Sequence, residues 1–232
     1  MPSSIGGRYA GRLNAFTIGF LASRQNPPAR KLNPRRPERW KHDRLRPVAS
    51  PIAHSFAGFW SFLVLASQLK ARLISQWRQY LPQLALLILL ANLPDLDFLI
   101  GLGTEANANA LHRGFTHSLA AAVFVALAVS CVWRIAASFW RSAILCFSAY
   151  SSHLLIDLCT GTKLGWNAAA SGIPLFWPSN KTYSSPFILV FGVRHENLHQ
   201  LFSIENMWSL IYELLTFGAI TAIVLAVRAR IG

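Results

Sequence analysis

The chain has 232 residues, of which 53% are apolar and only 13% are charged. Soluble globular domains carry about 25% charged residues, so this composition does not fit an ordinary soluble domain. The apolar fraction excludes a disordered polycation, and eight Trp, fifteen Phe and long uncharged runs argue against a soluble nucleic-acid-binding protein. The class that remains is a small membrane protein with a basic segment.

The basic charge is concentrated in the first fifty residues. They carry eleven Lys and Arg against Glu38 and Asp43, which is nine of the thirteen net positive charges, and several prolines exclude one long helix. This composition predicts a disordered tail over residues 1–50, solvated or seated on anionic lipid headgroups. A targeting peptide and a start codon placed too far upstream are open alternatives. Residues 51–232 are expected to form a transmembrane domain.

Five apolar stretches are candidates for membrane spans. They are residues 52–69, 81–99, 115–133, 142–158 and 207–227. A bilayer core of about 30 Å needs about 20 helical residues, so the shorter stretches fit with interfacial ends. The block 160–206 is richer in Gly, Pro, Ser and Trp, which predicts loops with one re-entrant piece over 186–193. We therefore predict an all-α fold, a polytopic helical membrane protein with about four or five transmembrane helices.

Seven residues that can bind a metal lie at the ends of the first four spans. Successive spans alternate in direction, so the start of the first, the end of the second, the start of the third and the end of the fourth lie on one membrane face. Ionisable side chains are costly in a bilayer and mark functional sites by default. We therefore predict a metal site at this face. The seven residues are His54, Asp95, Asp97, His112, His117, His153 and Asp157.

Two local spacings support this convergence. His153 and Asp157 are four residues apart, which stacks their side chains on one helix face, so the pair chelates one ion or the carboxylate orients the imidazole. Asp95 and Asp97 are two residues apart and would diverge on a continuous helix. The proline before Asp95 disfavours helical geometry at the residue that precedes it. A turn at this point would aim both carboxylates inward.

The ligand types indicate which metals to expect. Neutral imidazoles with carboxylates suit zinc, or manganese or iron, and the three cysteines show neither a disulfide nor a thiolate-zinc spacing. A catalytic zinc usually has three protein ligands and a water, so seven candidates indicate that some only orient the ligands or that two ions are bound. Taken singly, each residue also has a structural interpretation, such as an interfacial histidine or a polar pair between helices.

Four segments in chain order resemble one known family. They are Ser50-Pro51-Ile52-Ala53-His54-Ser55, Asn92-Leu93-Pro94-Asp95-Leu96-Asp97, His112-Arg113-Gly114-Phe115-Thr116-His117-Ser118 and His153-Leu154-Leu155-Ile156-Asp157. Over about residues 50–180 the chain resembles the membrane-bound, metal-dependent hydrolases of bacterial inner membranes, a YdjM-like family with LexA-regulated members. The resemblance implies a multi-pass inner-membrane hydrolase without implying its substrate. A weaker likeness to zinc-dependent phospholipase C, in the order of the ligands, favours phosphodiester or phospholipid substrates.

These observations predict an integral membrane metal-dependent hydrolase that acts on a phosphoester or lipid-type substrate through a metal-activated water. We expect one of Asp95 and Asp97 to be the general base and the other a ligand, and Arg113 to bind an anionic substrate. A snorkelling interfacial cation is the alternative for Arg113. The expected partners are the lipid bilayer and a phospholipid or lipid-linked substrate, with no nucleic acid. A membrane transporter and a non-catalytic metal-binding membrane protein are the other functions left open.

The side of the membrane that the site faces stays open. Basic residues in the short connections opposite the site predict, by the positive-inside rule, that their face is cytoplasmic and the site periplasmic. The basic tail joins the first span on the same face as the site and predicts the reverse. The basic residues opposite the site are Lys70, Arg72, Arg78, Arg134, Arg141, Arg228 and Arg230.

Overall fold

The computed structural model of the protein describes residues 49–68, 77–97, 114–166, 172–179, 181–193 and 203–231. This part of the chain forms five α-helices, three short 3₁₀ helices and four strands of two residues each. The fold is therefore mostly helical, as predicted, and the short strands are the departure from an all-α fold. The predicted tail over residues 1–50 lies almost wholly outside the described residues and stays a prediction.

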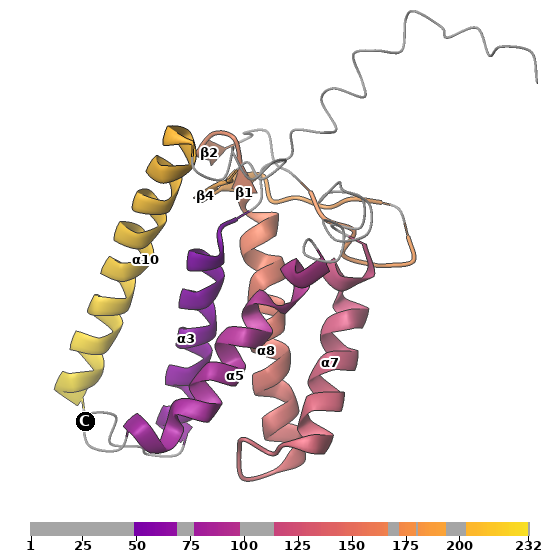
Figure 1. The fold of residues 1–232 in the computed structure, drawn as a ribbon, viewed down its shortest axis with the longest axis vertical. Helices are drawn as coiled ribbons and strands as arrows, with labels where there is room; N and C mark the ends of the chain where they lie inside the picture. Colours follow the sequence, from indigo (N-terminus) through magenta and orange to yellow (C-terminus); the bar gives the residue numbers. More distant parts are fainter. Residues whose placement is uncertain are drawn as a thin grey trace, which may run out of the picture. The chain divides into compact units, whose positions relative to one another are not determined.

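The helices lie side by side and run in alternating directions (Figure 1). α3 (Pro51–Gln68), α7 (Leu119–Val132) and α10 (Ile204–Ile231) run one way, and α5 (Leu81–Asn92) and α8 (Phe139–Leu158) run the other. α3 contacts α5, α8 and α10, and α8 also contacts α5 and α7. The 3₁₀ helices are η1 (Trp77–Tyr80), η2 (Leu93–Asp95) and η3 (Phe115–His117). As a result, the start of α3, the end of α5, the start of α7 and the end of α8 share the upper end in Figure 1.

Local chemistry explains where several helices begin and end. Ser118 starts α7 by accepting a hydrogen bond from the backbone N–H of Ala121 at 3.2 Å, and Ser138 starts α8 by accepting one from Arg141 at 3.3 Å. α5 ends at Asn92 and continues as η2: Pro94 has no N–H to extend the α-helical hydrogen bonds, and the N–H of Leu93 bonds to the carbonyl of Leu90 in the tighter 3₁₀ pattern, with Leu93 still in helical conformation. The apolar stretch predicted over 81–99 is thus a shorter α-helix followed by a tight turn.

α3 and α5 approach each other closely at Gly58. A Cβ atom at this glycine would lie 2.6 Å from the Cα atom of Ile88 and 2.8 Å from the carbonyl oxygen of Leu87, distances that no side chain tolerates. Small residues allow this kind of backbone contact between membrane helices. The contact fixes α5 against the helix that carries His54.

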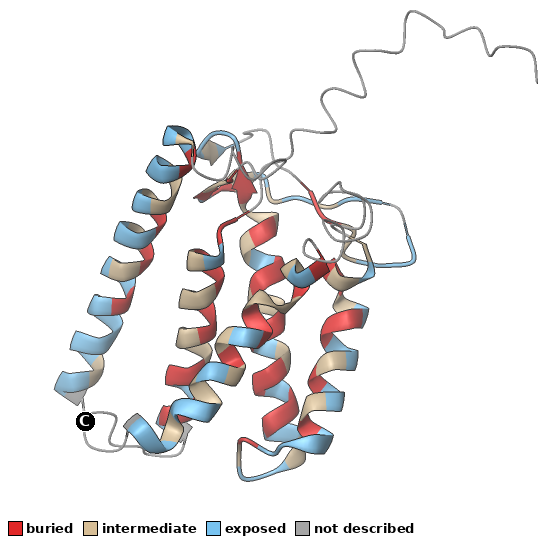
Figure 2. Ribbon diagram, in the orientation of Figure 1, coloured by how far each residue is buried: buried red, intermediate tan, exposed pale blue. Residues whose placement is uncertain are grey.

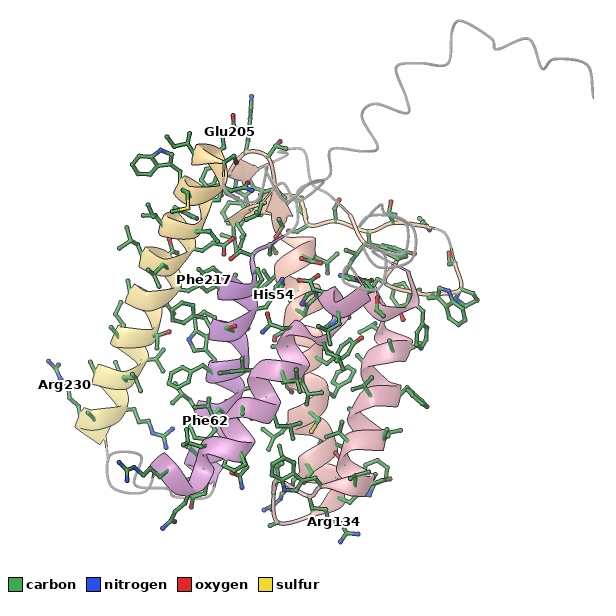
Figure 3. All side chains as sticks on the ribbon, viewed as in Figure 1. His54, Phe62, Arg134, Glu205, Phe217 and Arg230 are labelled. Carbon is green, nitrogen blue, oxygen red and sulfur yellow. The ribbon has the colours of Figure 1, made fainter. Side chains whose placement is uncertain are left out.

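The largest apolar core fills the part of the bundle away from the polar helix ends. Figure 2 shows buried residues along the inward faces of α3, α5 and α8, and Figure 3 places Phe62 in this lower part and His54 nearer the upper end. Apolar side chains packed in this way exclude water. The core consists of Phe62, Leu65, Ala66, Leu87, Leu90, Ala126, Ile135, Leu145, Cys146 and Ala149.

The segment after α8 forms two small sheets. β1 (Thr160–Gly161) pairs in parallel with β4 (Val190–Phe191), and β2 (Gly165–Trp166) pairs antiparallel with β3 (Phe187–Ile188). The structure therefore differs from the predicted re-entrant piece over 186–193. Backbone groups beyond the end of α8 need partners, and the segment supplies them, as when the N–H of Leu189 donates to the carbonyl of Cys159 at 2.9 Å.

Helix length gives partial support to the membrane prediction. Within the described residues, Ile204–Arg230 is the helix that is long and apolar enough to cross a membrane, while Pro51–Ser67 and Leu119–Val132 are apolar but shorter. At 1.5 Å per residue, the 14 residues of α7 extend about 21 Å, which is less than a bilayer core of about 30 Å. One membrane span is therefore supported by length and composition.

Candidate metal centre

Five of the seven predicted ligands come together where α3 begins and α8 ends. His54 lies in the first turn of α3, and His153 and Asp157 lie in the last two turns of α8. Asp95 is the last residue of η2 and His117 the last residue of η3. Four of these side chains are 0–1% exposed, and the fifth, Asp95, is 20% exposed. We call these five residues the polar cluster.

The other two predicted ligands are placed differently. His112 lies outside the described residues, as does Arg113, so their predicted roles stay predictions. Asp97 is buried beside the polar cluster, but it contacts the far side of the His117 ring.

Two imidazole nitrogens of the polar cluster lie close to each other and to one oxygen of each of two carboxylates. The Nε2 atoms of His117 and His153 lie 3.3 Å apart. Asp95 Oδ1 lies 3.5 Å from the first of these nitrogens and 3.4 Å from the second. Asp157 Oδ2 lies 3.5 Å from each of them. These distances are longer than good hydrogen bonds, whose donor and acceptor atoms are about 2.7–3.2 Å apart.

The same distances match the spacing of ligands around a metal ion. Nitrogen and oxygen ligands bind zinc at about 2.0–2.2 Å, and two such ligands at the tetrahedral angle are about 3.3–3.6 Å apart. The residues can therefore hold a cation without a large movement of their side chains.

The hydrogen bonds of His153 indicate where its proton lies. Its Nδ1 is 2.8 Å from the carbonyl oxygen of Ala91, and a carbonyl oxygen only accepts hydrogen bonds, so Nδ1 carries the proton and donates it. In the neutral ring the lone pair is then on Nε2, which faces the polar cluster. A backbone carbonyl that fixes a ring in this way is typical of histidines that bind metals.

The ring of His117 is oriented in the same way, by the side chains of Thr116 and Asp97. The hydroxyl of Thr116 donates to Asp97 Oδ2 at 2.6 Å and lies 3.1 Å from His117 Nδ1. Asp97 Oδ2 itself is 3.4 Å from that nitrogen. The Thr116 hydroxyl uses its hydrogen on Asp97, so its oxygen accepts from His117 Nδ1–H, and the Nε2 lone pair of His117 also points into the polar cluster.

Lone pairs and carboxylates therefore face each other in a buried space. In the part of the chain that the structure describes, each ion pair of Asp95 and Asp157 is with a histidine. Within the same ranges, Asp95 Oδ1 and both carboxylate oxygens of Asp157 have no hydrogen-bond partner. Buried acceptors without a donor are costly, and a cation removes that cost. The donor set thus fits a metal ion.

His54 extends the polar cluster on the side of α3. Its ring stacks on that of His153, with the ring centres 3.7 Å apart. Its Nε2 lies 3.7 Å from Asp157 Oδ1 and 3.8 Å from Asp95 Oδ2, and neither ring nitrogen has a hydrogen bond among the described residues. Two groups can hold a metal, His54 with His153 and Asp157, and Asp95 with His117 and His153. The groups share His153, whose single Nε2 lone pair binds one ion, so a second adjacent ion would have to be held by the carboxylates and His54 or His117.

Several residues that shape the polar cluster were missed by sequence reasoning. Thr116 links Asp97 to His117, and the hydroxyl of Tyr150 on α8 donates to the carbonyl of Thr116 at 2.7 Å, which holds η3 in place. The position of Thr116 next to His117 was a usable signal. The Ala91 carbonyl had no signal in the sequence, because every residue has one.

A second polar contact fixes the start of α3. Glu213 on α10 is fully buried, and its carboxylate accepts hydrogen bonds from the hydroxyl of Ser50 and from the Ser50 N–H, the latter at 3.3 Å. The carboxylate thus satisfies a backbone donor just before the helix and suits the positive end of the helix dipole. It ties α10 to the turn of α3 that carries His54.

The fold and site together define a class of protein. A mostly helical chain with one clear candidate span, and a buried histidine and aspartate cluster that can hold a metal ion, is a membrane protein with a candidate metal centre. The chain belongs to the YdjM inner membrane protein family, whose model matches residues 50–231. The family predicted from the sequence is therefore confirmed. No match was found among curated proteins or among solved structures.

Proposed function

We propose that this protein is a multi-pass inner-membrane hydrolase that depends on a divalent metal and acts on a phosphoester or lipid-type substrate. The observation that carries the proposal is the polar cluster. The Nε2 atoms of His117 and His153 lie 3.3 Å apart, and one oxygen of Asp95 and one of Asp157 each lie 3.4–3.5 Å from both nitrogens. Among the described residues, these two buried oxygens have no hydrogen-bond partner.

In this proposal each residue has a distinct task. One or two ions are held by His54, His117, His153, Asp95 and Asp157. This ligand set suits zinc, with manganese or iron as alternatives. A bound metal would lower the pKa of a water and polarise the ester oxygen under attack. Besides contributing to the metal site, Asp95 would take the proton from this water, because it is the most exposed carboxylate of the polar cluster.

Two further residues have supporting tasks. Asp97 positions His117 through its Nδ1 and is not itself a ligand. Arg113 binds the anionic substrate; this assignment rests on its sequence position between His112 and His117.

The multi-pass arrangement is supported by the surface of the helices. Large apolar side chains are exposed on separate helices, for example Phe124 on α7 (67%), Ile144 on α8 (63%) and Leu215 on α10 (67%). Soluble proteins rarely expose apolar surface on this scale, whereas membrane helices turn it toward lipid. The short helices α5 and α7 then cross with interfacial turns at their ends.

The transporter alternative requires a polar path through the bundle. The apolar core around Phe62, Leu65 and Leu87 instead fills the described part of the bundle beyond the polar cluster. For a non-catalytic metal site, full burial of every ligand would be expected, because a closed site keeps water out. The 20% exposure of Asp95 leaves a route for water and favours catalysis.

The proposal is tested on the full chain purified in detergent. We expect stoichiometric metal by mass spectrometry and metal-dependent hydrolysis of phosphodiesters or phospholipids. Asp95→Ala, His117→Ala and His153→Ala should each lower both metal content and turnover. Unchanged metal content in all three variants would overturn the proposed centre. Metal flux into proteoliposomes without hydrolysis would favour the transporter.

A further inference from the structure

An apolar groove runs along α3, the helix that carries His54. Its volume is about 500 Å³, and it is lined by five residues of α3 between Pro51 and Phe59, by Ile88 of α5 and by Thr221 of α10. Most of these side chains are only partly buried, so the groove is open at the side of the bundle. A ligand in the bilayer can therefore enter it laterally.

Among the described residues that line it, the groove offers no free side-chain polar group to a ligand. The hydroxyl of Ser55 donates to the carbonyl of Pro51 at 2.7 Å and accepts from the Asn92 amide at 3.2 Å. The hydroxyl of Thr221 donates to the carbonyl of Phe217 at 2.7 Å and accepts from the Trp60 ring at 2.8 Å. Both hydroxyls are thus satisfied within the protein. The surface that remains suits a hydrocarbon chain and not a polar molecule.

The dimensions of the groove suit one leaflet of a membrane. From Pro51 to Phe59 the helix rises about 12 Å at 1.5 Å per residue. One leaflet of a bilayer core of about 30 Å is about 15 Å deep. A chain that lies along α3 would therefore extend over most of the leaflet on the side of the polar cluster.

The groove begins at the level of the polar cluster. Pro51 and Ser55, at its upper end, belong to the same turn of α3 as His54. On α5, Ile88 lies two turns before Asp95, the most exposed member of the polar cluster. The residue between them, Asn92, binds Ser55 and stands next to Ala91, whose carbonyl holds His153.

We propose that the groove holds one acyl chain of a glycerophospholipid, with the phosphoester of that lipid at the polar cluster. The inference deepens the proposed function, on which its second half rests. Lateral binding from the leaflet would present the phosphoester to Asp95 while the acyl chain stays in an apolar environment, so the lipid need not leave the membrane.

Photolabelling tests the groove without relying on catalysis. The full chain is reconstituted in vesicles of phosphatidylethanolamine and phosphatidylglycerol that contain a phosphatidylethanolamine with a diazirine midway along one chain. Mass spectrometry of the irradiated protein should find labels concentrated on residues 51–59 of α3 and near Ile88. Labels spread evenly over α3, α7 and α10 would overturn the inference.

Groove-filling variants sharpen the test. Ile88→Trp should lower groove labelling about tenfold, and so should Ile52→Trp at the other end of the groove. This is the loss of affinity expected when about two methylene groups of the lipid are excluded from the groove. Leu89→Trp is the matched control, because Leu89 is the next residue on α5, is 53% exposed and does not line the groove. Unchanged labelling in both groove variants, with normal metal content and elution volume, would also overturn the inference.

A kinetic comparison separates this inference from the proposed function. Ile88→Trp should lower kcat/KM about tenfold for a long-chain phospholipid and much less for soluble bis(4-nitrophenyl) phosphate, while Leu89→Trp should leave both activities unchanged. Metal binding and hydrolysis without groove labelling would uphold the hydrolase and reject the groove. Groove labelling in a protein that binds no metal would uphold the lipid site and reject the hydrolase.

Discussion

The two ends of the helical bundle hold opposite kinds of buried surface. At the end away from the polar cluster, side chains such as Leu65 and Leu87 fill the space between the helices with apolar atoms. At the other end, the polar cluster brings imidazoles and carboxylates into a space where several oxygen and nitrogen atoms have no hydrogen-bond partner among the described residues. Apolar packing stabilises the fold by itself, whereas buried acceptors destabilise it until a cation binds. Stability and metal binding therefore depend on different ends of the same helices.

The largest effect is expected at the polar end. His153→Ala removes the residue that both metal-binding groups share, so we expect bound metal to fall below detection by mass spectrometry of the purified protein. Ser152→Ala is the matched control, because the Ser152 hydroxyl bonds to the carbonyl of Ala149 within its own helix. Equal metal content in the two variants would contradict the assignment of His153.

The second-largest effect is expected at the apolar end of the bundle. Leu87→Ala leaves a cavity in the core between α3, α5 and α8, and such truncations lower the free energy of unfolding by about 2–5 kcal/mol. Denaturation in detergent measures this loss, and Leu89→Ala on the exposed face of the same helix should change stability little. The folded fraction of Leu87→Ala should keep its metal. Loss of metal without loss of stability would break the proposed division of roles.

A smaller effect is expected where a side chain acts on the metal through a histidine. Asp97→Asn keeps the shape of the side chain but weakens its hold on the Nδ1 proton of His117. Metal affinity should fall about 10- to 100-fold, as for other residues that orient a ligand. Competition with a chelator measures it. An affinity equal to that of the wild type would exclude this positioning role, and complete loss of metal would indicate that Asp97 is itself a ligand.

The smallest effect compares the two serines that start helices at opposite ends. Ser118→Ala and Ser138→Ala each remove one capping hydrogen bond and should each cost about 1 kcal/mol of unfolding free energy. Only Ser118 adjoins His117, so only Ser118→Ala should also weaken metal binding. Equal metal affinities in the two variants would show that the start of α7 does not position the site.

Much of the helical arrangement could be predicted from the sequence, because apolar runs and their interruptions determine it. The run over 52–69 corresponds to α3, and Pro94 produces the turn expected before Asp95. The span predicted over 142–158 lies within α8, which begins at Phe139 because Ser138 caps its first turn. The strands were not predicted, because they consist of two-residue pairings between distant segments and leave no periodic pattern.

The details of the candidate site were harder to predict than its location. Alternating helix directions place His54, Asp95 and His153 at one level, and this follows from sequence order alone. The separate position of Asp97 depends on the turn at η2, whose direction no spacing rule gives. The pairing of Ser50 with Glu213 joins residues 163 positions apart, and a contact at that separation has no local signal.

The account's central claim is that the lone pairs of His117 and His153 bind a metal together with carboxylate oxygens. X-ray absorption spectroscopy of the metal-loaded full chain tests it most directly. The account predicts nitrogen and oxygen ligands at about 2.0–2.2 Å with an imidazole signal, and no bound metal in a double variant, His117→Ala with His153→Ala. Metal that dissociates on desalting, or a bound ion surrounded by oxygen ligands alone, would contradict it.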